Sequence, residues 1–203
     1  LSSMRYTTLA ISSLLLSTAP AYVIIISAIL FKERITMQKI AALLMMLTGC
    51  ILMTGVYEGA MSVSPKGVFL GAMSGVAYAS YSIFSRFALN RGYASETISF
   101  YTFLFAGAGS IPFVEFRHLA GVVNPNMAFY TVGMGVMCCA LPYILFTKGL
   151  GGVETSLAAI LATSEPLMAA LVGIVLFNEP MGFNDAAGML LIVLSIVVIN
   201  INM

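Results

Sequence analysis

The stretch APAYVIIISAILFKER, residues 19–34, has a counterpart 146 residues later in EPLMAALVGIVLFNEP, residues 165–180. Both have proline at the second position, Leu-Phe at the twelfth and thirteenth, and glutamate at the fifteenth. Proline and glutamate are the informative matches, because both are rare in this chain and costly inside a membrane. At the same spacing, further matches extend without a gap from Leu15 and Leu161 to Leu44 and Leu190. The pattern predicts an internal duplication of two apolar helices joined by a short polar turn.

Long uncharged runs make up most of the chain around these two stretches. They cover residues 6–31, 40–57, 67–85, 97–114, 119–147, 155–178 (interrupted only by Glu165) and 186–203. Each is near or above the roughly 18 to 20 residues with which a helix crosses a bilayer. A β-barrel would need segments of alternating polarity instead. With 60% hydrophobic and 8% charged residues, the sequence predicts an all-α integral membrane protein, a polytopic bundle of about seven transmembrane helices.

The number of spans between the two copies predicts their relative orientation. Three further runs lie between them, so a complete repeat would hold five spans, and an odd number requires the second copy to be inverted in the bilayer. The turn from Lys32 to Lys39 carries three cations, whereas the turn from Asn178 to Asp185 carries none. The positive-inside rule therefore places the first turn in the cytoplasm and the second outside.

The duplication also predicts how the chain is divided. Residues 1–57 would form the last two helices of a first repeat, and residues 66–203 all five helices of a second. A first repeat of equal length would begin well before Leu1, so we expect the chain to be a fragment that lacks about three helices.

The motif itself resembles a known family. An apolar helix with Pro20 that ends in Leu30-Phe31-Lys32-Glu33-Arg34, followed by Gln38 and Gly49, is echoed from Pro166 to Ser195. This pattern is similar to the EamA domain of the drug/metabolite transporter superfamily. The resemblance implies a ten-helix permease of two inverted five-helix repeats. The second copy departs from the first in having Glu179-Pro180 in place of Glu33-Arg34 and Ser195 in place of Gly49.

Glu165 is the first candidate for a functional residue, because it is the only charge in the interior of a predicted span. A carboxylate at the centre of a bilayer costs about 2.5 to 3.5 kcal/mol, so a cavity, a partner or protonation must offset it. One interpretation is structural: a hydrogen-bonded glutamate stabilises a kink at Pro166. The other is functional: Glu165 faces the transport pathway and binds a cationic or amine-bearing substrate, or a coupling proton.

The helix that opens the second repeat carries the other pathway candidates. Tyr78, Ser82 and Ser85, with Tyr81 beside them, could line a polar cavity. Alternatively, the serines bond to their own helix and the tyrosines anchor at the membrane interface. Small residues four apart on the same helix indicate a close helix contact, either static or sliding. These residues are Gly67, Gly71, Gly75 and Ala79.

Prolines and acidic residues recur at the same places in both copies. Pro20 and Pro166 are candidate hinges, because each can kink its helix. Glu33 and Glu179 stand beside helix ends, where a carboxylate can accept hydrogen bonds from the first amides of the following helix. Their recurrence favours an architectural role.

No catalytic, metal or cofactor site is predicted. Cys50, Cys138 and Cys139 lie in apolar runs without metal-binding spacing, and His118 is the only histidine. A net charge of +1 gives no attraction to nucleic acid.

The leading hypothesis is therefore a secondary transporter, in the plasma (cytoplasmic) membrane, that moves a small metabolite or drug-like molecule by alternating access. Its expected partners are the lipid bilayer and the substrate; coupling to protons and a homodimer are left open. The alternatives are a seven-helix receptor and a membrane-embedded enzyme, which lacks a catalytic constellation here.

Overall fold

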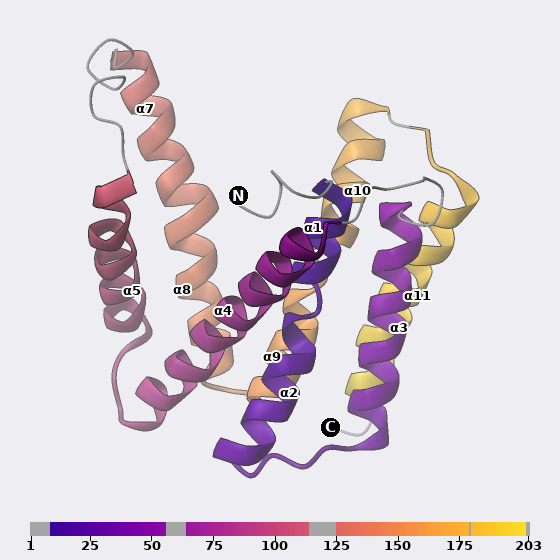
Figure 1. Ribbon diagram of the computed structural model, residues 1–203, viewed down its shortest axis with the longest axis horizontal. Coiled ribbons are helices and arrows are strands. Elements are labelled where there is room, and N and C mark those ends of the chain that lie inside the picture. Colours follow the sequence, from indigo (N-terminus) through magenta and orange to yellow (C-terminus); the bar gives the residue numbers. More distant parts are fainter. Residues whose placement is uncertain (1–8, 56–63, 114–124, 179, 202–203) are drawn as a thin grey trace. The chain divides into compact units, whose positions relative to one another are not determined.

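The computed structural model describes residues 9–55, 64–113, 125–178 and 180–201, and all regular structure in these ranges is helical (Figure 1). The elements in chain order are α1 (Leu9–Leu16), α2 (Ala19–Leu30), α3 (Met37–Thr54), α4 (Pro65–Asn90), α5 (Ser95–Ser110), the 3-10 turn η2 (Ile111–Phe113), α7 (Pro125–Met134), the π-helical η3 (Gly135–Ala140), α8 (Leu141–Leu150), α9 (Thr155–Ala162), α10 (Glu165–Phe177) and α11 (Phe183–Asn200).

Six helical segments in the described part of the chain are long and apolar enough to cross a membrane. They are Ser13–Leu30, Met37–Thr54, Pro65–Asn90, Met127–Leu150, Thr155–Phe177 and Phe183–Asn200. The sequence predicted about seven. The remaining run, 97–114, forms α5, which has 16 residues and gives way to the 3-10 turn that contains Pro112, a residue without an amide to continue the helix.

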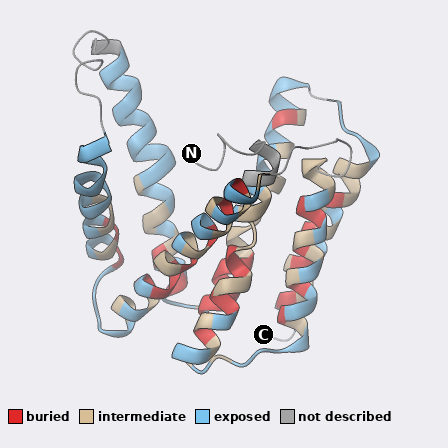
Figure 2. Cartoon of the chain, viewed as in Figure 1, coloured by how far each residue is buried: buried red, intermediate tan, exposed pale blue. Residues whose placement is uncertain are grey.

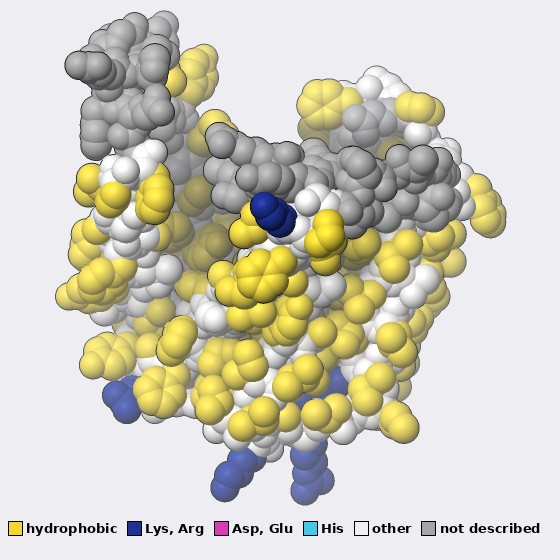
Figure 3. All heavy atoms as spheres, in the orientation of Figure 1, with side chains coloured by type: hydrophobic (Ala, Val, Ile, Leu, Met, Phe, Trp, Pro, Cys, Tyr) yellow, Lys and Arg dark blue, Asp and Glu magenta, His cyan; other side chains and the backbone are white. Residues whose placement is uncertain are grey.

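Many residues of the described helices are exposed (Figure 2), and large apolar side chains cover much of the described surface on the face in view (Figure 3). Phe113 and Phe183 are each 87% exposed and Met37 is 83% exposed. Exposing so much apolar surface to water would be strongly unfavourable for a folded protein, whereas lipid tails solvate it.

Two helices are interrupted at matching positions. The break between α1 and α2 falls at Ser17–Thr18, and the break between α9 and α10 falls at Thr163–Ser164, 146 residues later. The helix starts at Met37 and Phe183 have the same spacing. Pro20 and Pro166 each lie in the first turn of the helix after the break, where a missing amide costs no hydrogen bond. Each proline therefore begins a new helix instead of kinking a continuous one.

The chain divides into two compact units, and the matched helices belong to the first, residues 1–83 with 153–203. Within this unit α3 packs along α11 in antiparallel orientation: a side chain at Gly49 would meet Ile192, and one at Gly188 would meet Met53. The end of α2 likewise lies beside the start of α9, because Glu33 bonds to Thr155. α3 and α11, whose starts are 146 residues apart, thus run in opposite directions (Figure 1).

The glycines predicted on α4 make close contacts within the first unit. A Cβ atom at Gly71 would collide with Leu15, and one at Gly75 would lie 3.1 Å from the Leu15 carbonyl oxygen and 3.2 Å from the Tyr22 ring. These small residues let α4 approach the α1–α2 break closely.

The second unit, residues 84–152, is held by contacts between α5 and α8. The Phe103 and Tyr143 rings meet edge to face with centroids 5.2 Å apart. Lys148 forms an exposed ion pair with Glu96 at 2.7 Å.

Candidate functional site

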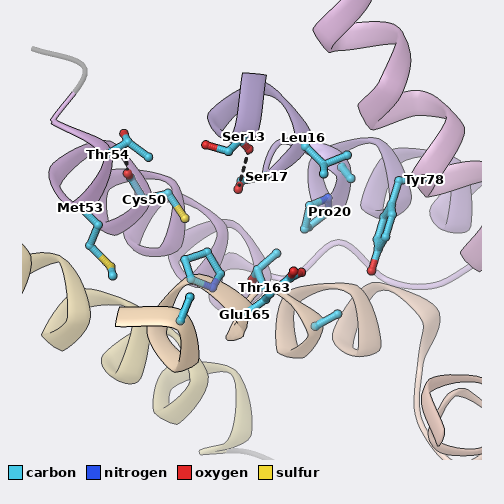
Figure 4. A pocket seen from close by; sticks show the side chains of 14 residues that line it. Ser13, Leu16, Ser17, Pro20, Cys50, Met53, Thr54, Tyr78, Thr163 and Glu165 are labelled. Carbon is cyan, nitrogen blue, oxygen red and sulfur yellow. Dashed lines mark hydrogen bonds between the residues drawn. The ribbon is translucent and has the colours of Figure 1, made fainter. Parts of the chain in front are cut away.

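A pocket of about 270 Å³ lies between the two helix breaks of the first unit (Figure 4). Its described lining comes from both copies of the repeated helices, from the end of α3 and from α4. These residues are Ser13, Leu16, Ser17, Ala19, Pro20, Cys50, Met53, Thr54, Tyr78, Ala162, Thr163, Glu165, Pro166 and Ala169. Both breaks contribute equivalent positions, such as Pro20 and Pro166. The pocket therefore lies at the junction of two discontinuous helices.

Three hydroxyls in the pocket donate their protons to the backbone of their own helices. Ser17 Oγ donates to the Ser13 carbonyl at 3.1 Å, Thr54 Oγ1 to the Cys50 carbonyl at 2.8 Å, and Thr163 Oγ1 to the Ile160 carbonyl at 2.5 Å. Such bonds satisfy the donor of each hydroxyl and leave oxygen lone pairs free to accept.

Glu165 supplies the negative charge of the pocket. It is the first residue of α10, where the partial positive charge of a helix start favours a carboxylate, and its side chain is exposed to the cavity. Tyr78 of α4 lines the same pocket. The structure thus brings together two of the predicted pathway residues, from different helices.

The other predicted pathway residues of α4 do not line this pocket. Ser82 is completely buried and Ser85 is 2% exposed. Ala79 and Ile83 of the same helix pack against Val23 and Ala159. Ser82 Oγ has no hydrogen-bond partner among the described residues. Tyr81, half-buried, is not among the described lining residues.

Glu33 is at the centre of a second polar group, which we call the Glu33 cluster: Glu33, Lys39, Glu154, Thr155 and Ser156. Its carboxylate accepts hydrogen bonds from the Thr155 amide at 2.7 Å and from the Ser156 amide at 3.1 Å and hydroxyl at 2.5 Å. The sequence analysis expected this carboxylate to accept hydrogen bonds from the first amides of the helix that follows it. The helix is α9, however, and not α3, the one that follows Glu33.

Lys39 joins the cluster from the first turn of α3. It is 6% exposed, and its Nζ donates to Glu154 Oε2 at 2.5 Å and to the Arg34 carbonyl at 3.0 Å. The same nitrogen lies 3.8 Å from Glu33 Oε2. Two carboxylates and a carbonyl therefore surround the buried ammonium group.

Burial and hydrogen bonding oppose one another at Glu33. Burial raises the pKa of this carboxyl group, but the bonds from the Ser156 hydroxyl and the two amides lower it by more, so the pKa lies below its ordinary value. The group is charged at neutral pH, as a residue bound to a helix start should be.

The sequence analysis missed the roles of Lys39, Glu154 and Ser156. One local signal was available: α9 begins after Glu154, which makes no side-chain cap of its own. The uncapped helix start therefore needed a partner from elsewhere. Glu179, the counterpart of Glu33, lies outside the described residues.

Comparison with known proteins identifies the family. The model of the EamA-like transporter family matches residues 1–55 and 65–201. The chain belongs to the EamA-like transporter family. Two uncharacterized transporters of Archaeoglobus fulgidus are similar to it, at 32% identity over 188 residues and 28% over 199 residues.

These relatives are longer than the chain. The matches cover 93% and 96% of the chain, but 66% and 68% of the two relatives. A crystal structure of another protein matches the entire chain and 72% of its own with a TM-score of 0.77, at 20% sequence identity. This last likeness concerns the fold alone.

Family and fold together establish a multi-pass integral membrane protein in contact with lipid. The family is one of transporters, and both relatives are named as uncharacterized transporters. In the described part of the chain, no group of three or more His, Cys, Asp or Glu residues could hold a metal ion.

Proposed function

We propose that the chain forms part of a secondary transporter of the cytoplasmic membrane, which moves a small molecule by alternating access and binds it in the pocket between the two helix breaks. The observation that carries the proposal is the pocket itself, lined by equivalent residues of both copies and containing the carboxylate of Glu165. Discontinuous helices facing each other across a cavity are typical of substrate sites in transporters built from inverted repeats.

The duplication supports a rocking mechanism. Helix starts and breaks recur 146 residues apart, and the equivalent helices run antiparallel. Two such copies can exchange conformations, each taking the arrangement of the other, so that the pocket opens alternately to the two sides of the membrane.

One end of the first unit is closed in this structure. Between the pocket and the Glu33 cluster, a core of buried apolar residues joins α2, α3, α9 and α11. It consists of Ile24, Ala42, Leu157, Ile160 and Ile199. Along α3, Lys39 of the cluster and Cys50 of the pocket are eleven residues, or about 17 Å, apart. We assign this end to the cytoplasmic side, because the turn beside it carries Lys32, Arg34 and Lys39.

In this mechanism the Glu33 cluster is the cytoplasmic gate. Its bonds hold the end of α2 against the start of α9. They break when the gate opens and re-form when it closes. Glu165 is the pathway residue, which binds the substrate or a coupling proton in the pocket.

Counterflow in proteoliposomes tests the proposed class of function. Vesicles containing the full-length protein and loaded with unlabelled solute should accumulate the same labelled solute transiently, because a carrier exchanges one molecule for another. A receptor or an enzyme does not produce this overshoot. Screening a metabolite mixture by mass spectrometry for solutes retained or lost by such vesicles supplies the candidates. If no solute in the screen shows counterflow, the proposal is wrong.

A further inference from the structure

The side chains of the pocket offer acceptors to a ligand and few donors. The hydroxyl protons of Ser17, Thr54 and Thr163 are already bonded to carbonyl groups of their own helices. Each of these oxygens keeps a lone pair directed away from that bond. A ligand that meets them must therefore donate hydrogen bonds.

Charge points to the same class of ligand. Glu165 is the one charged residue among the described lining residues, which include no lysine, arginine or histidine. A carboxylate in surroundings of low dielectric strongly attracts a cation and repels an anion. An anionic ligand would meet this charge with no basic side chain from the described lining to balance it.

The helix starts at the pocket do not reverse this preference. Helix starts generally attract anions through their free amides, but Pro20 and Pro166 remove one amide from the first turn of α2 and of α10. At α10 the carboxylate of Glu165 already lies in that first turn. An anion at this helix start would therefore meet a negative charge of the protein itself.

The size of the pocket limits the ligand. A volume of about 270 Å³ corresponds to roughly nine water molecules at about 30 Å³ each. Sites for drug-sized molecules usually have about 300 to 1,000 Å³. Leu16, Met53, Pro20 and Pro166 contribute apolar wall, so the part of the ligand that carries no charge is apolar.

We propose that the ligand of this pocket is a small primary or secondary amine in its protonated form, with an apolar body of a few carbons. Its ammonium group donates hydrogen bonds to Glu165 and to the hydroxyl oxygens of Ser17 or Thr163, and its body contacts Leu16, Met53 and the two prolines. The inference rests on the proposed function in one respect: it takes this pocket to be the transport site.

Binding to the purified full-length protein in detergent tests the ligand class without any substitution. The probes are pentylamine, pentanoate, pentanol and pentyltrimethylammonium, which share one carbon skeleton. At a hundredfold excess over Kd, we expect pentylamine to raise Tm by roughly 5 °C, and the other three to bind at least about tenfold more weakly. Equal or tighter binding of pentanoate or pentanol would overturn the proposal. Equal binding of the trimethylammonium compound would overturn the part that concerns N–H donation.

Two matched variants then locate the site. Glu165→Gln should weaken pentylamine binding about ten- to a hundredfold, because a charge-assisted hydrogen bond is replaced by a neutral one. Glu96→Gln removes an exposed carboxylate of the second unit and should leave the affinity unchanged. Tm without ligand reports whether each variant is folded. Unchanged affinity in a folded Glu165→Gln variant would contradict the assignment to this pocket.

Transport assays separate this inference from the proposed function. If proteoliposomes show counterflow of carboxylates or alcohols and none of amines, the protein is a carrier and the inferred ligand class is wrong. If pentylamine binds through Glu165 but neither it nor any other amine shows counterflow, the ligand class is correct and the proposed function is wrong.

Discussion

Glu33 Oε2 accepts two hydrogen bonds from Ser156, one from its amide at 3.1 Å and one from its hydroxyl at 2.5 Å. The two residues are 123 positions apart in the sequence and belong to different copies of the repeated unit. A carboxylate that follows α2 thus completes the start of α9 and joins the two copies at one end.

The first prediction concerns the stability that this contact provides. In Glu33→Gln, the charge is lost and only one acceptor oxygen remains for three donors. The side chain is 8% exposed, so we expect a loss of about 1 to 3 kcal/mol, measured as a lower Tm in detergent at neutral pH. Glu96→Gln is the matched control, because it removes a carboxylate that is 57% exposed in a surface pair and should change Tm little. Equal losses in both variants would contradict the special role of Glu33.

The second prediction is a pH dependence with a defined sign. The pKa of Glu33 is lowered in the folded chain from its ordinary value of 4.5, so its contribution is present above that value and is lost as the pH falls through the lowered folded pKa. The difference in Tm between wild type and Glu33→Gln should therefore be constant near neutral pH and shrink under acidic conditions. A difference that grows on acidification would have the wrong sign.

The third prediction tests the close packing of α3 against α11. A Cβ atom at Gly188 would lie 2.5 Å from Met53 Cγ and 2.7 Å from the Gly49 carbonyl oxygen, so the backbone must shift to admit it. Gly188→Ala should destabilise the protein by about 1 to 3 kcal/mol. Gly107→Ala in α5 is the control: nothing described lies within 4 Å of its Cβ position, and alanine favours a helix. If Gly107→Ala lowered the stability more than Gly188→Ala, the close packing of α3 against α11 would be contradicted.

The fourth prediction is topological. In a cysteine-free background, Ile35→Cys and Met181→Cys place single thiols at positions that are 53% and 55% exposed, one in each turn of the duplicated motif. A membrane-impermeant maleimide added to intact cells should label position 181, whereas position 35 should react only after permeabilisation. If positions 35 and 181 were both labelled from the same side of the membrane, the inverted arrangement would be wrong.

Much of the membrane-spanning pattern was evident in the sequence, because hydropathy over eighteen residues reflects the thickness of a bilayer. The 146-residue spacing likewise predicted where the helices of the second copy begin. Hydropathy is insensitive to local backbone geometry, however. It could not reveal that α5 stops before Pro112, or that Ser17–Thr18 and Thr163–Ser164 interrupt helices within predominantly apolar segments.

The candidate site was only partly predictable. Glu165 stood out because a charge within a span is costly, and Tyr78 because its helix gathers hydroxyl groups. Spacing along α4 could not show that Ser82 and Ser85 are buried and do not line the pocket with Tyr78, since the neighbours of a helix face are set by tertiary packing. The Glu33 cluster joins residues more than a hundred positions apart, and the helix start after Glu154 gives no indication of which distant residue completes it.

The fifth prediction tests the central claim, that Glu165 in the pocket between the breaks takes part in transport. Counterflow of a substrate found by the metabolite screen should be compared for wild type, Glu165→Gln and Glu96→Gln of the full-length protein, reconstituted in equal amounts. Glutamine keeps the shape of the side chain and removes its charge. We predict that transport by Glu165→Gln is at least about tenfold slower, corresponding to roughly 1.4 kcal/mol of lost interaction, while Glu96→Gln transports at the wild-type rate. Transport by a folded Glu165→Gln variant at the wild-type rate would contradict the account.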